Sequence, residues 1–323
     1  MAIKKKSDAS SQTRKIRAKK LAVSIIGAGR VGTAFGIGLR KAGYEIDLLV
    51  AKHERSAKRA ARLIGSPVVA LSAAQFRRLT KTNVPQSSLI IIATPDGVIE
   101  SIANELAAMF RARGPNNPVK NRVVLHTSGA FPAQVLRPLR DRGFAIGSLH
   151  PLISISDSEI GAKELTHSFF SLEGDAAAVR LGRRMGRDLG GQSFTINSSA
   201  KPLYHAAALM ASPGMTALFD IAVEMLVRCG LSRTRARKIL LPLVKSTLEN
   251  LKTQDPARAL TGTFKRGDIA TVRKHLAAIE SQKMRDALEA YVVLGRRSLA
   301  LSDHAPNEKA IRRLLTRVSL RSA

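Results

Sequence analysis

Residues 21–32 read LAVSIIGAGRVG, an apolar stretch that ends in three glycines, Gly27, Gly29 and Gly32. The β-branched residues before the first glycine are typical of a buried strand, and the small and apolar residues up to Leu39 are typical of a helix. In such a turn the first glycine allows the tight bend, the second lets a ligand approach the backbone, and the third lets the helix pack on the strand. The spacing therefore predicts a turn that holds a pyrophosphate.

The context of this turn supports the prediction. Gly43 ends the expected helix, and residues 45–50 form a second apolar strand, which completes a βαβ unit of about 30 residues. We expect a dinucleotide coenzyme whose phosphates meet the free N–H groups and the positive dipole end of the helix. The alternative is a glycine-rich turn without a ligand. The expected coenzyme contacts in the turn are Gly27, Gly29, Arg30, Val31 and Gly32.

The residues after the second strand bear on which dinucleotide binds. Enzymes that use NAD usually place an acidic residue there to hold the ribose 2′-hydroxyl. In this chain Val50 is followed by AKHERS, residues 51–56. We predict that Lys52, Arg55 and Ser56 hold a 2′-phosphate, which favours NADP, with NAD as the alternative. Glu54 argues against this prediction. The alternative is that Lys52 and Arg55 are only solvated charges at the start of a helix.

Length and composition bound the class of protein. The 323 residues are enough for two domains, and the hydrophobic content is 45%. We find no uninterrupted apolar run near 18 residues, which predicts a protein that does not span a membrane. The single cysteine, Cys229, excludes an intramolecular disulfide framework. With no secretory signal apparent, we expect a cytoplasmic location.

The charge balance is strongly basic, with 53 Lys and Arg against 24 Asp and Glu and a formal net charge of +29. Residues 1–20 are predicted to form a disordered basic tail that binds polyanions non-specifically. Aromatic residues are few (3 Tyr, 10 Phe and no Trp), so base stacking and specific nucleic-acid binding are not expected.

Strands and helices alternate as far as Asn197, and only helices are expected beyond it. We place the domains at 1–20 for the tail, 21–197 for an α/β domain and 198–323 for a helical domain. The expected strands after the first unit are 67–70, 89–93, 122–126, 144–149, 168–172 and 192–196. The expected helices are 73–79, 98–110, 175–188, 201–229, 232–252, 269–279, 284–301 and 307–318.

Polar residues follow three of the expected strands, and in an open parallel sheet such residues form the ligand edge. Their alternative role is to cap the next helix. The coenzyme is predicted to contact Thr94, Pro95, Asp96, His126, Thr127 and Ser128. The substrate is predicted to contact Ser128, Gly129 and His150.

Five motifs in fixed order resemble those of one bacterial family across residues 21–291. They are GAGRVG (27–32), HTSGA (126–130), SLHPL (148–152), KPLYHAAA (201–208) and LTGTFKRGD (260–268). The family is described as Rossmann-like with a C-terminal domain of unknown function. It is related to the 6-phosphogluconate, β-hydroxyacid and ketopantoate dehydrogenases and to pyrroline-5-carboxylate reductase.

The resemblance implies an α/β fold, in which a Rossmann-type dinucleotide-binding domain precedes an all-α domain of the 6-phosphogluconate dehydrogenase C-terminal type. It also implies a homodimer and a nicotinamide-dependent oxidoreductase. Two departures from the family pattern stand out. Ala211, Ser212 and Pro213 replace ASN, which removes an amide ligand, and Thr263 replaces the proline of LTGP.

Lys201 and His205 are four residues apart at the start of a helix and therefore share a face. By resemblance, Lys201 stands where β-hydroxyacid dehydrogenases polarise the substrate oxygen, and a nearby ammonium or imidazolium can stabilise an alkoxide and supply a proton. The alternative role of Lys201 is a solvated charge at the start of the helix, and that of His205 is a histidine in the domain interface. Arg266 is a candidate clamp for an anionic substrate, and Asp268 a helix cap. No histidine spacing suggests a metal site.

Together these features predict an NADP-dependent oxidoreductase for a small, anionic carbonyl, imine or hydroxyacid substrate. The alternative is a dinucleotide-binding regulatory or scaffold protein that has lost turnover, which Pro213 favours and Lys201 and His205 oppose.

Overall fold

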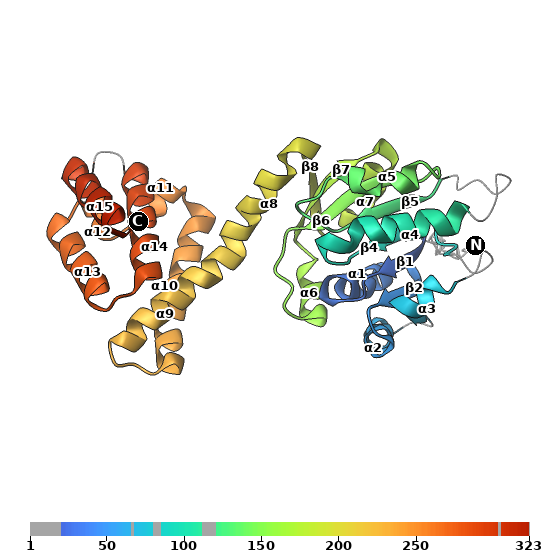
Figure 1. Cartoon of the computed structure of the whole chain (residues 1–323), viewed down its shortest axis with the longest axis horizontal. Coiled ribbons are helices and arrows are strands. Elements are labelled where there is room, and N and C mark those ends of the chain that lie inside the picture. Colours follow the sequence, from blue (N-terminus) through green and yellow to red (C-terminus); the bar gives the residue numbers. More distant parts are fainter. Residues whose placement is uncertain (1–20, 66–67, 80–84, 112–120, 303–304, 323) are drawn as a thin grey trace, which may run out of the picture. The chain divides into compact units, whose positions relative to one another are not determined.

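The computed structural model describes residues 21–65, 68–79, 85–111, 121–302 and 305–322, and the predicted basic tail lies outside them. The chain divides into two compact units, residues 1–208 and 209–323 (Figure 1).

The first unit is built on an eight-stranded sheet with the order β3-β2-β1-β4-β5-β6-β7-β8. The strands are β1 (Ala22–Ile26), β2 (Glu45–Ala51), β3 (Val69–Ser72), β4 (Leu89–Ile92), β5 (Val123–His126), β6 (Ala145–Pro151), β7 (Phe169–Gly174) and β8 (Gln192–Thr195). Neighbouring strands are parallel from β3 to β6, but β7 pairs antiparallel with β6. The sheet is therefore parallel from β3 to β6, as in the predicted dinucleotide-binding fold, and β7 reverses direction because the chain re-enters the sheet at the edge where β6 ends.

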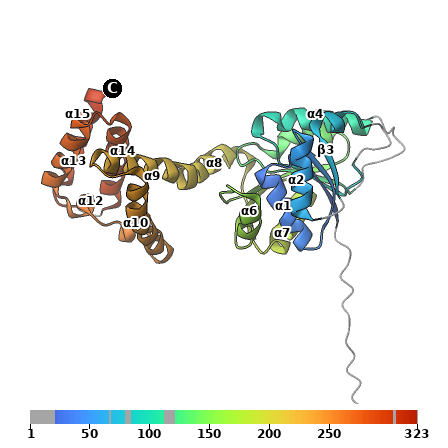
Figure 2. The same ribbon diagram turned by 90° about the horizontal axis from the view of Figure 1, so that it is seen from below.

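Helices cover both faces of the sheet, as Figure 2 shows. On one face lie α1 (Arg30–Lys41), α2 (Glu54–Ile64), α6 (Ser158–Glu164) and α7 (Ala176–Asp188). On the other lie α3 (Ala73–Arg77), α4 (Ile99–Arg111) and α5 (Arg137–Arg140), with the short 3-10 helices η1 (Asp96–Val98) and η2 (Ala133–Leu136) beside them. The β1 residues Val23 and Ile25 pack toward the first set of helices and Ile26 toward the second, because alternate side chains of a strand point to opposite faces.

A long helical stretch follows the sheet and η3 (Ser198–Ala200). It consists of α8 (Lys201–Leu209), a π-helical turn η4 (Met210–Gly214) that contains Pro213, and α9 (Met215–Arg228). Residues 198–228 are long and apolar enough to cross a membrane by length and composition alone, with a mean hydropathy of 1.5 in a window that is 6% buried. Polar residues are scattered through this stretch, so it contains no uninterrupted apolar run near 18 residues.

The second unit contains α9, α10 (Arg233–Thr253), α11 (Pro256–Ala259), α12 (Thr263–Arg266), α13 (Ile269–Ser281), α14 (Arg285–Leu301) and α15 (Glu308–Ser322). Its core joins α13, α14 and α15 through Val272, Leu276, Val292 and Ile311. Both domain types thus agree with the predicted fold class.

Candidate functional site

The three glycines of the first turn differ in what surrounds them. Gly27 has φ +103°, and a Cβ there would lie 2.5 Å from the Ala93 carbonyl carbon. At Gly32 a Cβ would lie 2.2 Å from the Gly27 carbonyl oxygen. Gly29 has φ −81°, and a Cβ there would meet nothing within 4 Å. The fold therefore requires Gly27 and Gly32, whereas the space over Gly29 is open for a ligand.

The N-terminus of α1 is available to such a ligand. Gly29 is its N-cap residue and offers no side-chain cap, and the first turn contains no acidic residue. The first N–H that closes a helical hydrogen bond is that of Thr33, to the Gly29 carbonyl oxygen at 2.9 Å. Free N–H groups and the positive end of the dipole make this terminus suitable for an anion.

A pocket of about 400 Å³ lies beside the turn, between α1, α2 and the start of α6. Of the predicted coenzyme contacts, Gly29, Arg30 and Ser56 line it. Arg59, which the sequence analysis did not select, lines it too, one turn after Ser56 on α2. Lys52 and Arg55 are exposed but do not line it.

The Glu54 carboxylate, which argued against NADP, is bound by two other side chains of the protein. It lies 2.5 Å from the Lys58 ammonium and accepts a hydrogen bond from Gln75, and these contacts lower its pKa. Glu54 thus has cationic and amide partners within the protein.

Thr94, Pro95 and Asp96 follow β4 at the same edge of the sheet, next to Gly27. The Thr94 hydroxyl oxygen is buried and has no hydrogen-bond partner among the described residues. Asp96 lies in the first turn of η1, and no side-chain capping bond forms there.

The loop after β5 is held by its own side chains. His126 is fully buried, accepts a hydrogen bond from the Ser128 N–H at Nδ1 (3.2 Å) and donates from Nε2 to the Pro132 carbonyl oxygen (3.3 Å). Burial, with a smaller effect of the Lys201 charge, lowers the pKa of His126 to about 3. The Ser128 hydroxyl accepts from the N–H groups of Ala130 and Phe131 and so caps a turn.

Lys201 lies behind this loop, in the same unit. Its ammonium donates to the Ser148 hydroxyl oxygen at 2.8 Å and to the Ser128 carbonyl oxygen at 3.2 Å, and the residue has no exposed surface. Burial lowers its pKa to about 8, although the carboxylates of Glu173 and Asp96 act in the opposite direction. The lysine therefore points toward the predicted substrate loop rather than into solvent.

Two imidazoles converge on Gly129. A Cβ at Gly129 would lie 2.4 Å from His205 Nδ1 and 2.9 Å from His150 Nε2. Nδ1 of His150 lies 2.7 Å from the Tyr204 hydroxyl, whereas Nδ1 of His205 is buried without a partner among the described residues. Burial, with the His205 and Lys201 charges, lowers the pKa of His150 to about 4, so its ring is neutral at pH 7.

The fold thus gathers Ser128, Gly129, His150, Lys201 and His205 at the ends of β5, β6 and the start of α8. The sequence analysis did not identify Ser148, Tyr204 and Glu173. The only sequence signal for Ser148 and Tyr204 was their place inside the SLHPL and KPLYHAAA motifs, and the only signal for Glu173 was its position in a strand. Arg266 belongs to the other unit, where it is exposed at the end of α12. In the part of the chain that the structure describes, no group of three or more His, Cys, Asp or Glu could hold a metal ion.

Comparison with known families assigns both domains. Residues 5–151 match a Rossmann-like domain, and residues 168–298 match a domain of unknown function, DUF2520. The chain is a Rossmann-like protein with a DUF2520 domain. This assignment confirms the resemblance seen in the motifs. Among curated proteins, none matches the chain by sequence.

Several solved structures share the fold of this Rossmann-like DUF2520 protein. A protein from Bacteroides fragilis, provisionally described as an NADP oxidoreductase, is 17% identical with a TM-score of 0.67, and the match covers 87% of this chain and 99% of that one. An imine reductase from Myxococcus stipitatus in complex with NADP+ is 15% identical (TM-score 0.60; 92% and 99% covered). Pyrroline-5-carboxylate reductase from Streptococcus pyogenes is 16% identical (TM-score 0.57; 88% and 100% covered). At these identities the likeness shows the fold.

Proposed function

We propose that this protein is an NADP-dependent oxidoreductase that transfers a hydride between nicotinamide and a small, anionic carbonyl, imine or hydroxyacid substrate. The observation that carries the proposal is Gly29, where neither backbone conformation nor packing requires a glycine. A position that must stay open only for a ligand, at an uncapped helix N-terminus, fits the pyrophosphate of a dinucleotide.

The surroundings of this turn favour NADP over NAD. Arg30, Ser56 and Arg59 line the adjacent pocket together with Asp157 and Glu159, and guanidinium groups bind phosphate through charge-assisted hydrogen bonds. The Asp157 carboxylate accepts hydrogen bonds from the N–H groups at the start of α6. Lys52 and Arg55 follow β2 and add positive charge nearby. Two of the structural neighbours are described as an NADP oxidoreductase and as an NADP+ complex of an imine reductase, which supports the same choice.

The bound coenzyme would supply or accept the hydride, and the protein would manage charge and protons. As a carbonyl or imine carbon is reduced, its oxygen or nitrogen gains negative charge. The Lys201 ammonium, which lies behind the loop after β5, stabilises this charge. We assign proton donation to His205, because its Nδ1 has no partner among the residues that the structure describes and lies next to Gly129. His150 is held by Tyr204 and orients the substrate. Arg266 stays a predicted clamp for an anionic group.

One alternative function has a specific observation in its favour. Lys201 has no exposed surface, and its two hydrogen bonds end within the protein. With Pro213 in place of an amide, this burial is also compatible with a dinucleotide-binding regulatory or scaffold protein without turnover.

We further propose that the protein is a cytoplasmic homodimer. Large apolar residues are exposed along α9 and α10, and a second copy of the chain would cover them. We propose that the dispersed positive charge makes only non-specific contacts with polyanions. We also propose that the protein does not insert into a membrane.

Calorimetry with NADPH and NADH, followed by a screen of small imines and oxoacids for loss of NADPH absorbance, tests the proposal. Tighter binding of NADPH and turnover of at least one substrate are expected. Absence of binding for both coenzymes would refute the coenzyme assignment. Binding without turnover across the screen would favour the regulatory alternative.

A further inference from the structure

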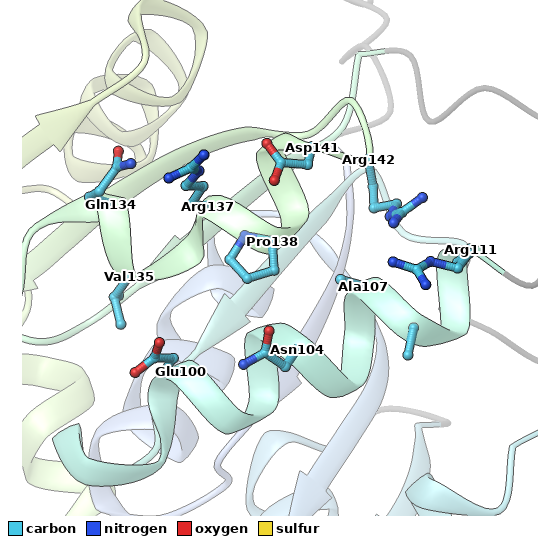
Figure 3. A pocket seen from close by; sticks show the side chains of 11 residues that line it. Glu100, Asn104, Ala107, Arg111, Gln134, Val135, Arg137, Pro138, Asp141 and Arg142 are labelled. Carbon is cyan, nitrogen blue, oxygen red and sulfur yellow. The ribbon is translucent and has the colours of Figure 1, made fainter.

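A groove of about 480 Å³ lies away from the glycine turn, between α4 and the η2–α5 segment (Figure 3). Its walls belong to the face of the sheet opposite to α1 and α2. Ala107 and Pro138 give it small apolar sides, and the Asn104 amide reaches into it from α4. None of these residues belongs to the candidate active site.

Two arginines at one end of the groove point toward one another. Figure 3 shows the guanidinium groups of Arg111, at the end of α4, and Arg142, just after α5, converging. The Nε of Arg142 is buried and has no hydrogen-bond partner among the described residues. Like charges repel, and a buried N–H without an acceptor costs free energy, so this end of the groove is incomplete without an anion.

The two carboxylates that line the groove do not supply that anion. Asp141 points away from the Arg142 guanidinium in Figure 3. Glu100 lies eleven residues before Arg111 on the same helical stretch, which corresponds to about 16 Å along the axis at 1.5 Å per residue. Among the described residues neither carboxylate forms an ion pair with Arg111 or Arg142.

We propose that Arg111 and Arg142 bind the phosphate group of a small phosphorylated ligand. One planar guanidinium already satisfies both oxygens of a carboxylate, whereas two converging guanidiniums match the three terminal oxygens and the higher charge of a phosphate. The Ala107 and Pro138 sides and the Asn104 amide then contact the rest of the ligand. This second anion site is independent of the coenzyme and does not rest on the proposed oxidoreductase function.

The test is a titration of the full-length protein with inorganic phosphate, against chloride at equal ionic strength. Calorimetry gives the affinity, and the arginine Nε–H signals in NMR spectra report which guanidinium gains an acceptor. We expect the Arg142 signal to shift, and Arg142→Gln and Arg111→Gln to weaken phosphate binding at least about tenfold, the scale of a hydrogen bond to a charged group. Unchanged melting temperatures in both variants show that the fold is intact.

Two further variants separate this site from other causes. Arg183→Gln removes the same charge from an exposed position on α7 and should leave phosphate binding unchanged. Gly29→Val blocks the glycine turn, the other anion site of the protein, and should leave the phosphate-induced shift of the Arg142 signal unchanged. Absence of phosphate binding, equal loss in Arg183→Gln, or loss in Gly29→Val but not in Arg142→Gln would each overturn the proposal.

Discussion

Among the residues of the glycine turn, Gly29 is distinguished by what a side chain there would contact. Gly27 adopts a conformation that side chains disfavour, and a Cβ at Gly32 would collide with a backbone oxygen. At Gly29 neither reason applies, so replacement should affect the ligand and not the fold.

We therefore predict that Gly29→Val loses NADPH binding at least about 100-fold while keeping its unfolding free energy within about 0.5 kcal/mol, as for most exposed substitutions. The matched control is Gly32→Val, which must displace the Gly27 carbonyl and should lower the melting temperature clearly. Calorimetry and thermal unfolding of both variants provide the measurement. Unchanged NADPH affinity in Gly29→Val would contradict the coenzyme site.

Lys201 allows a second prediction at the residue scale. Lys201→Met keeps most of the buried volume but removes the ammonium, and turnover should fall about 10² to 10³-fold, as when one preorganised donor is lost. NADPH affinity should change little. Lys201→Arg should retain charge but not restore full turnover, since the fork of the guanidinium does not reproduce the bonds to Ser128 and Ser148. Full activity in Lys201→Met would assign the lysine a purely structural role.

Two histidines with lowered pKa values, the buried His126 and the half-buried His150, predict how stability depends on pH. His126 and His150 have folded pKa values of about 3 and about 4, against 6.5 in the unfolded chain. Below pH 6.5 the histidines of the unfolded chain take up protons, whereas those of the native state stay neutral. The free energy of unfolding is therefore highest above pH 6.5 and falls as the pH drops toward 4. For the fully buried His126 the slope approaches about 1.4 kcal/mol per pH unit.

His126→Asn keeps an acceptor for the Ser128 N–H but cannot titrate. Urea unfolding across this range should therefore show a shallower loss of stability in the variant than in the native protein. A variant with the same pH dependence as the native protein would show that His126 is not the titrating group.

Local sequence predicted residues whose role is local. The three glycines, the Asp268 cap, which accepts from the Thr271 N–H, and the polar ends of the strands were all identified. Ser148 and Tyr204 were not, because a serine within a strand and a tyrosine on a helix gain their meaning only from partners 53 and 54 residues away. The complete burial of Lys201 was missed for the same reason.

At the scale of elements, periodicity placed most strands and helices within a few residues of their observed bounds. The predicted helix 98–110 is α4 (Ile99–Arg111), and the strand 122–126 is β5. The direction of β7 could not be predicted, because pairing depends on where the chain re-enters the sheet. The π-helical turn at Pro213 interrupts a helix predicted as continuous, since proline removes an N–H donor and clashes with the preceding turn.

The start of α2 predicts how the two coenzymes are distinguished. Arg55→Ala and Arg59→Ala should each weaken NADPH binding more than NADH binding, because only NADPH carries a ribose 2′-phosphate for a guanidinium to bind. Arg59 lines the pocket beside Gly29 and Arg55 does not, so the Arg59 variant should show the larger selectivity change. Affinities for both coenzymes, with Arg62→Ala on the same helix as control, provide the measurement. A native preference for NADH would refute NADP as the coenzyme.

At the scale of the whole molecule, the helical unit exposes large apolar side chains along two of its helices, and contiguous exposed apolar patches mark interaction sites. On α10, Ile239, Leu241, Leu243, Leu248 and Leu251 are between 42% and 65% exposed. On α9 the exposed residues include Met215 and Leu218. These exposed residues of α9 and α10 are not covered by the core of the helical unit, so we infer that another surface covers them.

We predict that a second copy of the chain covers this surface. Obligate dimers commonly bury more than ~2,000 Å², which α9 and α10 together are long enough to supply. Light scattering at micromolar concentration should give twice the chain mass of 34.8 kDa. Leu241→Glu combined with Leu243→Glu should shift the protein to monomer, because burying two carboxylates in an apolar interface is costly. Val69→Glu, which adds one charge at an exposed position of β3, should leave the dimer intact. A native monomer, or binding of the native protein to lipid vesicles in place of self-association, would show that the apolar face serves another partner.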